Sequence, residues 1–110
     1  MSVIISLSDS NWAEFIGSKT SIVIFSKTDC VQCLEFLSKL EQSGIPGRFL
    51  IGKLTLDEAG SAKLKISNPW VSTIDKLPFC SVFKGGKLVD SWAISNIDNF
   101  QNRIEKSISN

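Results

Sequence analysis

Two cysteines separated by two residues form the most reactive pattern in the chain: Cys30 and Cys33 enclose Val31 and Gln32. Residues three apart on a helix lie on one face with Cβ atoms about 5–6 Å apart, close enough for a disulfide. A helix N-terminus carries unpaired N–H groups and positive partial charge, which favour a thiolate. We therefore expect a pair that opens and closes, in which Cys30 attacks and Cys33, one turn deeper, resolves the mixed disulfide.

Two other interpretations of this pair stay open. The side chains could be small buried hydrophobic groups, or they could form half of a zinc site. A tetrahedral zinc site needs four ligands, and because the chain has no histidine only Cys80 remains to join the pair. The absence of histidine also excludes Ser-His-Asp and Cys-His catalysis. Redox chemistry is the better prediction for a cysteine pair after a βαβ-like start, and no metal is expected.

Length and charge limit the other functions. The chain of 110 residues can bury one hydrophobic core, so we expect a single domain over residues 1–110. Its net charge of +1 gives no support for binding nucleic acid or anionic lipid. Its apolar stretches are too short to cross a bilayer, and residues 1–8 do not resemble a secretory signal. A cytoplasmic location is expected.

The hydrophobic pattern predicts alternating strands and helices. The expected strands are Ser2–Leu7, Ser21–Phe25, Arg48–Leu56, Phe79–Phe83 and Lys87–Trp92. The expected helices contain Trp12, Phe15 and Ile16; Val31, Leu34, Leu37 and Leu40; residues 57–67; and Ile97, Phe100, Ile104 and Ile108. The second strand is almost continuously apolar, which is typical of a central strand buried on both faces.

Short signals mark the ends of these elements. Asn11 with Glu14, and Ser95 with Asp98, have the spacing of N-terminal helix caps. Lys84–Gly86 predicts a tight hairpin between the last two strands. The order is therefore βαβαβαββα, in which the crossovers make the early strands parallel and the hairpin adds an antiparallel edge. This order predicts an α/β fold, a central mixed sheet flanked by helices.

The pattern as a whole resembles the thioredoxin family over nearly the entire chain. The matching features are the C-x-x-C at a strand-to-helix turn, Leu77-Pro78 before a strand, the FKGGKLV hairpin that follows, and Lys53 within KLTLD. The local stretch SKTDCVQC is closer to NrdH-redoxins, the glutaredoxin-like hydrogen donors of ribonucleotide reductase. The resemblance implies a thioredoxin fold and a thiol-disulfide oxidoreductase that needs no cofactor.

The resemblance also implies roles for residues near the cysteines. Pro78 matches the family's cis-proline, whose loop offers backbone groups to an extended substrate segment. Leu77 precedes it in the same loop. Asp29, Val31 and Gln32 adjoin or separate the cysteines. All five residues are expected to contact substrate.

Two positions near the cysteines depart from the family pattern. Thioredoxins usually have Trp before the first cysteine, whereas Asp29 stands here, and its charge disfavours a thiolate unless Lys27 offsets it or both are solvated loop charges. The family usually buries an aspartate six residues before the first cysteine, where this chain has Ile24. Proton transfer from the resolving thiol would then use water or Lys53, although Lys53 could simply extend to solvent.

Three further features have both a structural and a functional interpretation. The segment Ile66–Leu77 is longer than its thioredoxin counterpart, so Trp70 could form a docking surface for substrate beside the cysteines or pack into the core. Cys80 is expected to be a free core cysteine, with a regulatory thiol as the alternative. The glycines at 85 and 86 favour a simple turn over a glutathione site. The remaining two tryptophans are expected in the core.

Together these features predict a protein-disulfide reductase that works by dithiol exchange, in electron transport and redox homeostasis. The expected partners are disulfide-containing client proteins and a thioredoxin-reductase-like flavoenzyme, with ribonucleotide reductase as a further acceptor. The chain is expected to be a monomer. Two alternatives remain: a protein-binding module whose cysteines are not essential, and a glutathione-dependent, glutaredoxin-like reductase that needs only Cys30.

Overall fold

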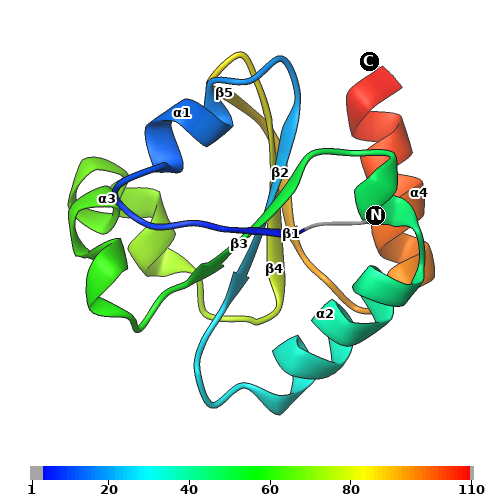
Figure 1. Cartoon of the computed structure of the whole chain (residues 1–110), viewed down its shortest axis with the longest axis horizontal. Coiled ribbons are helices and arrows are strands. Elements are labelled where there is room, and N and C mark those ends of the chain that lie inside the picture. The colour runs from blue at the N-terminus through cyan, green and yellow to red at the C-terminus, as the bar shows by residue number, and fades with distance from the viewer. Residues whose placement is uncertain (1–3, 110) are drawn as a thin grey trace.

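Five strands form one mixed sheet in the computed structural model, which describes residues 4–109 (Figure 1). Their order across the sheet is β1-β3-β2-β4-β5. Neighbouring strands are parallel from β1 to β2 and antiparallel from β2 to β5, as predicted. The part of the first predicted strand at residues 2 and 3 lies outside the described residues. The strands are β1 (Ile4–Ser6), β2 (Ser21–Ser26), β3 (Ile51–Thr55), β4 (Phe79–Lys84) and β5 (Lys87–Ala93).

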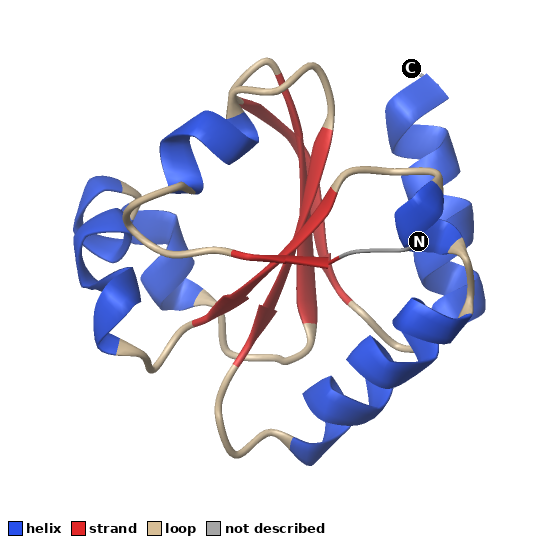
Figure 2. Cartoon of the chain, in the orientation of Figure 1, coloured by secondary structure: helices blue, strands red, loops and turns tan. Residues whose placement is uncertain are grey.

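Helices cover both faces of the sheet (Figure 2). The α-helices are α1 (Trp12–Ile16), α2 (Val31–Gln42), α3 (Ala62–Ser67) and α4 (Ile97–Ser109). Three short 3₁₀ helices are η1 (Ile45–Gly47), η2 (Ala59–Ser61) and η3 (Pro69–Thr73). α2 and α4 pack on one face, and α1, α3 and η3 pack on the other. In residues 4–109, no helix combines the length and the apolar character needed to cross a membrane.

The centre of the molecule is β2, all six residues of which are buried. Ile22 and Ile24 face the cluster beneath α2 and α4, while Val23 and Phe25 face the cluster beneath α1 and α3. The continuous apolar run is needed because successive side chains of a strand point to opposite faces, and here both are covered. The two remaining tryptophans, Trp12 and Trp92, are buried as expected.

The predicted helix after Cys30 is present, but the four apolar residues that recur at a spacing of three do not share one buried face. Val31 and Leu34 are 65% and 60% exposed, while Leu40 is fully buried. A spacing of three falls behind the helical repeat of about 3.6 residues, so Val31 and Leu40 are about two and a half turns apart and lie on opposite sides. The buried face consists of Cys33, Phe36, Leu37 and Leu40.

Both predicted N-terminal caps are wrong in detail. Asn11 precedes α1, but its side chain accepts from Ser8 N–H at 2.8 Å and donates to the carbonyl of Ser6 at 3.0 Å, so it ties the preceding loop. α4 begins one residue after Asn96, whose side-chain oxygen accepts from Asn99 N–H at 2.9 Å. Asn96 therefore takes the capping role that was expected of the Ser95 and Asp98 pair.

The third strand and the following helix are both shorter than predicted. Residues 48–50 do not join β3, because the N–H groups of Arg48 and Phe49 bond back to the carbonyl of Ile45 and continue the turn of η1. α3 starts only at Ala62. Its N-terminal N–H groups, those of residues 63 and 64, donate to the carboxylate of Asp9 at 3.0 and 2.7 Å. This cap comes from a distant loop and leaves no local sequence signal.

The hairpin between β4 and β5 forms at the predicted glycines. Gly85 and Gly86 have φ values of +59° and +87°. Two consecutive positive φ values are those of the turn whose twist matches a two-residue hairpin, and glycine adopts them without steric cost. The prediction of a simple turn at these glycines is confirmed.

A polar cluster joins β5 to α4 at the edge of the sheet. The guanidinium of Arg103 donates to both carboxylate oxygens of Asp90 at 3.1 and 2.9 Å, and Ser107 Oγ donates to Asp90 at 2.6 Å. The same guanidinium lies 4.6 Å from the ring centre of Trp92. The hydrogen bond from Arg103 is the main cause that lowers the pKa of Asp90, and the bond from Ser107 adds to it.

We predict that Asp90→Asn lowers the free energy of unfolding at neutral pH by about 1 kcal/mol, because the bidentate ion pair is lost. The folded pKa of Asp90 lies below its unfolded value, so its contribution is complete above the unfolded pKa and disappears as the pH falls through the folded pKa. Urea unfolding of both proteins from about pH 7 to about pH 3 should show this difference shrinking. A difference that is independent of pH would contradict the assignment. Asp75→Asn, at an exposed loop position, is the matched control.

Candidate active site

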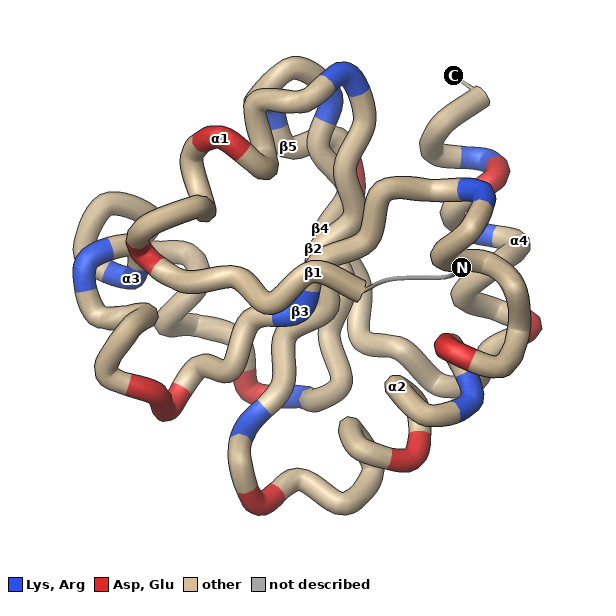
Figure 3. Tube along the Cα trace, viewed as in Figure 1, with Lys and Arg blue, Asp and Glu red and all other residues tan. Residues whose placement is uncertain are grey.

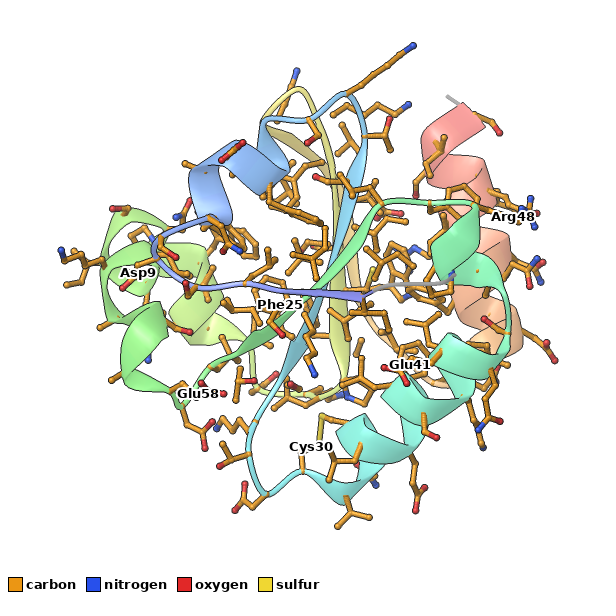
Figure 4. All side chains as sticks on the ribbon, in the orientation of Figure 1. Asp9, Phe25, Cys30, Glu41, Arg48 and Glu58 are labelled. Atoms are coloured by element: carbon orange, nitrogen blue, oxygen red, sulfur yellow. A yellow bond between two sulfur atoms is a disulfide. The ribbon has the colours of Figure 1, made fainter. Side chains whose placement is uncertain are left out.

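Cys30 and Cys33 form a disulfide at the N-terminus of α2, with their Cα atoms 5.2 Å apart. Cys30 is the N-cap residue, and its Sγ accepts the N–H of Cys33 at 3.2 Å. Cys30 is partly exposed, whereas Cys33 is fully buried on the inner side of the first turn. Figure 4 shows Cys30 at the edge of the molecule, where α2 begins. The predicted disulfide and the deeper position of Cys33 are confirmed.

The loop that leads to Cys30 carries both signs of charge. Lys27 and Asp29 are both exposed, and the trace in Figure 3 shows Lys or Arg and Asp or Glu interspersed around this end of the molecule. The N–H of Cys30 donates to the carbonyl of Lys27 at 3.2 Å, which closes a turn across residues 27–30. The chain passes from β2 into α2 through this turn, which contains no aromatic side chain.

The loop before β4 lies beside the first turns of α2, which begins at the cysteine pair. The peptide bond between Leu77 and Pro78 is cis, as predicted. The Pro78 carbonyl accepts the N–H of Ile94 at 2.9 Å, which places the segment after β5 next to this loop. This loop, the segment after β5 and the first turns of α2 line a groove of about 340 Å³. The residues lining it include Gln32, Leu77 and Pro78, together with Ile94, Asn96 and Ile97.

Three residues next to this region were not identified as site residues from the sequence. Leu34 was named only as an apolar residue of the expected helix, yet with Val31 it forms an exposed apolar surface on the first turns of α2. Thr28, in the loop before Cys30, hydrogen-bonds to Asp57, which lies 29 positions later in the loop after β3. The exposure of Leu34 follows from the helical period, which the spacing of three obscures, but the Thr28–Asp57 contact has no sequence signal.

Comparison with known proteins identifies the fold through structure alone. No protein-family model matches the sequence, and no curated protein sequence gives a significant match. The oxidised thioredoxin of Plasmodium falciparum superimposes with a TM-score of 0.75 at 21% identity, covering 94% of this chain and 97% of that one. Malassezia sympodialis thioredoxin gives 0.76 at 16% identity, covering 97% and 92%. Chlamydomonas reinhardtii thioredoxin f2 gives 0.77 at 12% identity, covering 94% and 95%.

The chain has the thioredoxin fold. The fold prediction is thereby confirmed, including the position of the cysteine pair at the start of α2 and of the cis-proline before β4. The closer likeness to NrdH-redoxins, which rests on the residues around Cys30, stays a prediction.

In this thioredoxin fold, Trp70 belongs to the sheet face opposite α2. Its ring packs edge-on against Phe25, with ring centres 5.8 Å apart, and at a tilt against Phe83, with ring centres 6.3 Å apart. It is half-buried against the cluster that α1 and α3 cover. This position is the one expected if Trp70 packs into the core. A contact between Trp70 and substrate remains a prediction without support from this packing.

The predicted proton-transfer candidate lies on the strand beside Ile24. Lys53 on β3 is in register with Ile24 on β2, and it is half-buried. Ile24 is completely buried. The structure therefore places an apolar side chain where the family pattern leads one to expect a carboxylate. Within the described part of the chain, no three His, Cys, Asp or Glu side chains gather closely enough to hold a metal ion.

Cys80 is a free thiol in the core of the same fold. It lies in β4, in register with Ile24 on one side and Trp92 on the other, and it is completely buried. Burial raises the pKa of its thiol well above the ordinary value. The prediction of a core cysteine is confirmed, and the thiol is protonated at neutral pH.

We predict that Cys80 resists thiol reagents in the native oxidised protein, because it is both inaccessible and protonated. A coloured aromatic disulfide reagent should detect almost no thiol in the native protein and one thiol per chain in denaturant without reductant. Cys80→Ala should show none in either condition. Fast labelling of native Cys80 would contradict its placement.

Proposed function

We propose that this protein reduces disulfide bonds in other proteins by dithiol exchange through Cys30 and Cys33. The observation that carries the proposal is the asymmetry of the pair. One sulfur, at a helix N-terminus, is partly exposed, and its partner is buried one turn deeper. Dithiol exchange needs this asymmetry, because one sulfur must be accessible to the client disulfide and the other must lie close enough to attack the mixed disulfide.

The first step starts from the reduced pair. The Cys30 thiolate attacks one sulfur of the client disulfide, so that a bond forms between Cys30 and the client and the client's own S–S bond breaks. The leaving client sulfur departs as a thiolate and takes a proton from solvent. The N–H of Cys33, which lies 3.2 Å from Cys30 Sγ in the oxidised protein, supports the negative sulfur before attack.

The second step releases the client. The Cys33 sulfur, as a thiolate, attacks Cys30 Sγ, which re-forms the Cys30–Cys33 bond and expels the second client thiolate. The client gains two electrons and two protons, and the pair is oxidised to the disulfide seen here. Cys33 needs only a small adjustment, because the Cα atoms are 5.2 Å apart in the product.

The pair must then be reduced from outside. We propose a thioredoxin-reductase-like flavoenzyme as the electron donor and the cytoplasm as the location, because a reductase needs a reducing compartment. Client proteins with accessible disulfides are the proposed substrates, and ribonucleotide reductase is one proposed acceptor. The chain is proposed to work as a monomer.

The groove and the exposed apolar surface at the first turns of α2 support a protein client. We propose that a client segment binds in the groove at Gln32, Leu77 and Pro78, and that Val31 and Leu34 contact the surface around the client disulfide. A mixed disulfide brings the client surface within bonding distance of Cys30, so these two side chains would be buried in the complex and would favour association. Asp29, exposed beside Cys30, would lie at the rim.

We predict that Cys30→Ser abolishes reduction of insulin disulfides, with dithiothreitol or with NADPH and a thioredoxin reductase as the electron source. Cys33→Ser should stop turnover at the mixed disulfide, because nothing remains to displace the client from Cys30. Mass spectrometry should detect that adduct in Cys33→Ser and not in the double variant.

Each alternative function gives a different result in these assays. Glutathione-coupled activity that persists in Cys33→Ser would replace the dithiol mechanism with a monothiol one. A wild-type protein that is inactive with every reductant, and that binds a partner equally well without its cysteines, would replace the reductase with a binding module.

We further predict that the double variant Val31→Glu, Leu34→Glu raises the KM for a protein client roughly three- to tenfold, which corresponds to about 1 kcal/mol of lost binding. The rate at which dithiothreitol reduces the Cys30–Cys33 disulfide should change much less. Ile66→Glu is the matched control, because Ile66 is 80% exposed on α3, which packs on the opposite face of the sheet. Equal effects of the double variant and the control would show that the surface beside Cys30 does not contact clients.

A further inference from the structure

An acidic residue from a neighbouring loop holds the segment that leads to Cys30. Thr28 lies two residues before Cys30, and Asp57 lies two residues after the end of β3. The Thr28 N–H donates to the two carboxylate oxygens of Asp57 at 3.1 and 3.4 Å. The Thr28 hydroxyl donates to Oδ2 at 2.6 Å. One carboxylate therefore binds both hydrogen-bond donors of a single loop residue.

This contact lies outside the core. Both Thr28 and Asp57 are exposed, so the contact buries little surface and adds little to global stability. It fixes the backbone locally instead. The carbonyl of Ser26 accepts the N–H of Leu56 at 2.8 Å, and the N–H of Cys30 donates to the carbonyl of Lys27 at 3.2 Å. Residues 26–30 are thus held at successive points, two of them by residues 56 and 57.

We propose that Asp57 is a positioning residue for Cys30: by fixing Thr28, its carboxylate keeps Cys30 in the N-cap conformation. This inference rests on the proposed dithiol function, in which Cys30 attacks. Cys30 Sγ accepts the N–H of Cys33 only while residue 30 keeps its φ of −87° and ψ of 98°. That contact and the field of α2 stabilise the thiolate, so a loosened loop weakens the nucleophile.

The charge of Asp57 by itself acts in the opposite direction. The Thr28 hydroxyl is the main cause that lowers the pKa of Asp57, and the charge of Lys27 adds to it, so the carboxylate is ionised at neutral pH. A nearby anion disfavours a second anion, and exposed Asp29 adds another negative charge to this loop. If Asp57 acted only through its charge, its removal would make Cys30 more reactive. A positioning role predicts that removal makes Cys30 less reactive.

The test measures alkylation of Cys30 by iodoacetamide in the reduced protein from about pH 4 to about pH 9, with peptide mapping to separate the three cysteines. In Asp57→Ala, the rate near pH 7 should fall roughly threefold or more, and the midpoint of the pH profile should rise by roughly half a unit or more. In Asp57→Asn, the amide oxygen can accept the Thr28 N–H and the amide nitrogen can donate to the Thr28 hydroxyl. This variant should recover most of the wild-type rate. Glu58→Ala, at the exposed neighbouring position, should match the wild type.

Two results would overturn the proposal. Faster alkylation of Asp57→Ala than of the wild type would show that the carboxylate acts through its charge, and an unchanged profile would show that the loop is held without it. If Asp57→Ala does not fold, Thr28→Val, which removes only the hydroxyl donor, must shift the profile in the same direction. Alkylation requires no client, so a wild type that reduces no protein disulfide would refute the proposed function and leave this measurement intact.

Discussion

The burial of β2 on both faces is the constraint on which the rest of the structure depends. Because β2 is buried on both sides, the chain becomes exposed only beyond the ends of this strand. Ser26 is the last buried residue before the exposed turn at residues 27–29. α2 must then return across one face to cover Ile22 and Ile24. Its N-terminus is therefore fixed at the carboxyl end of the central strand, where α/β sheets commonly hold reactive groups. The position of Cys30 therefore follows from the packing of β2 and α2.

The strand directions bring the other parts of the site to the same end of the sheet as Cys30, the carboxyl end of β2. β3 is parallel to β2, so the segment after β3, with Asp57, leaves the sheet beside the loop before Cys30. β4 is antiparallel to β2, with Phe25 in register with Phe79. β4 therefore starts at this end of the sheet, and the loop with cis-Pro78 lies just before it. β5 is antiparallel to β4, so the chain returns here at Ile94. One mixed sheet thus gathers four segments that are distant in the sequence.

The sequence was sufficient for features that depend on local period or on a short motif. The apolar run of β2, the glycine pair of the hairpin and the C-x-x-C all carry their physical cause within a few residues. Contacts between distant loops carry none. Asp9 caps α3 from more than 50 positions away, and Asp57 binds Thr28 across 29 positions. Asn96 was missed as a cap for a different reason. Ser95, next to it, has an equally good capping pattern, and only the position of the first helical residue shows which of the two is the cap.

Ile24 shows how the demands of the core and of the site meet on one strand. A carboxylate at this completely buried position would lose its hydration, which costs several kcal/mol unless a partner compensates it. Isoleucine adds buried apolar surface to the strand that organises the sheet. Lys53, in register beside it, is half-buried, so its ammonium group can stay hydrated without a buried acid. We infer that the chain favours the stability of β2 over a built-in proton acceptor. In the proposed dithiol mechanism, solvent would then take the proton from Cys33 when the mixed disulfide is resolved, because the Lys53 ammonium already carries its proton.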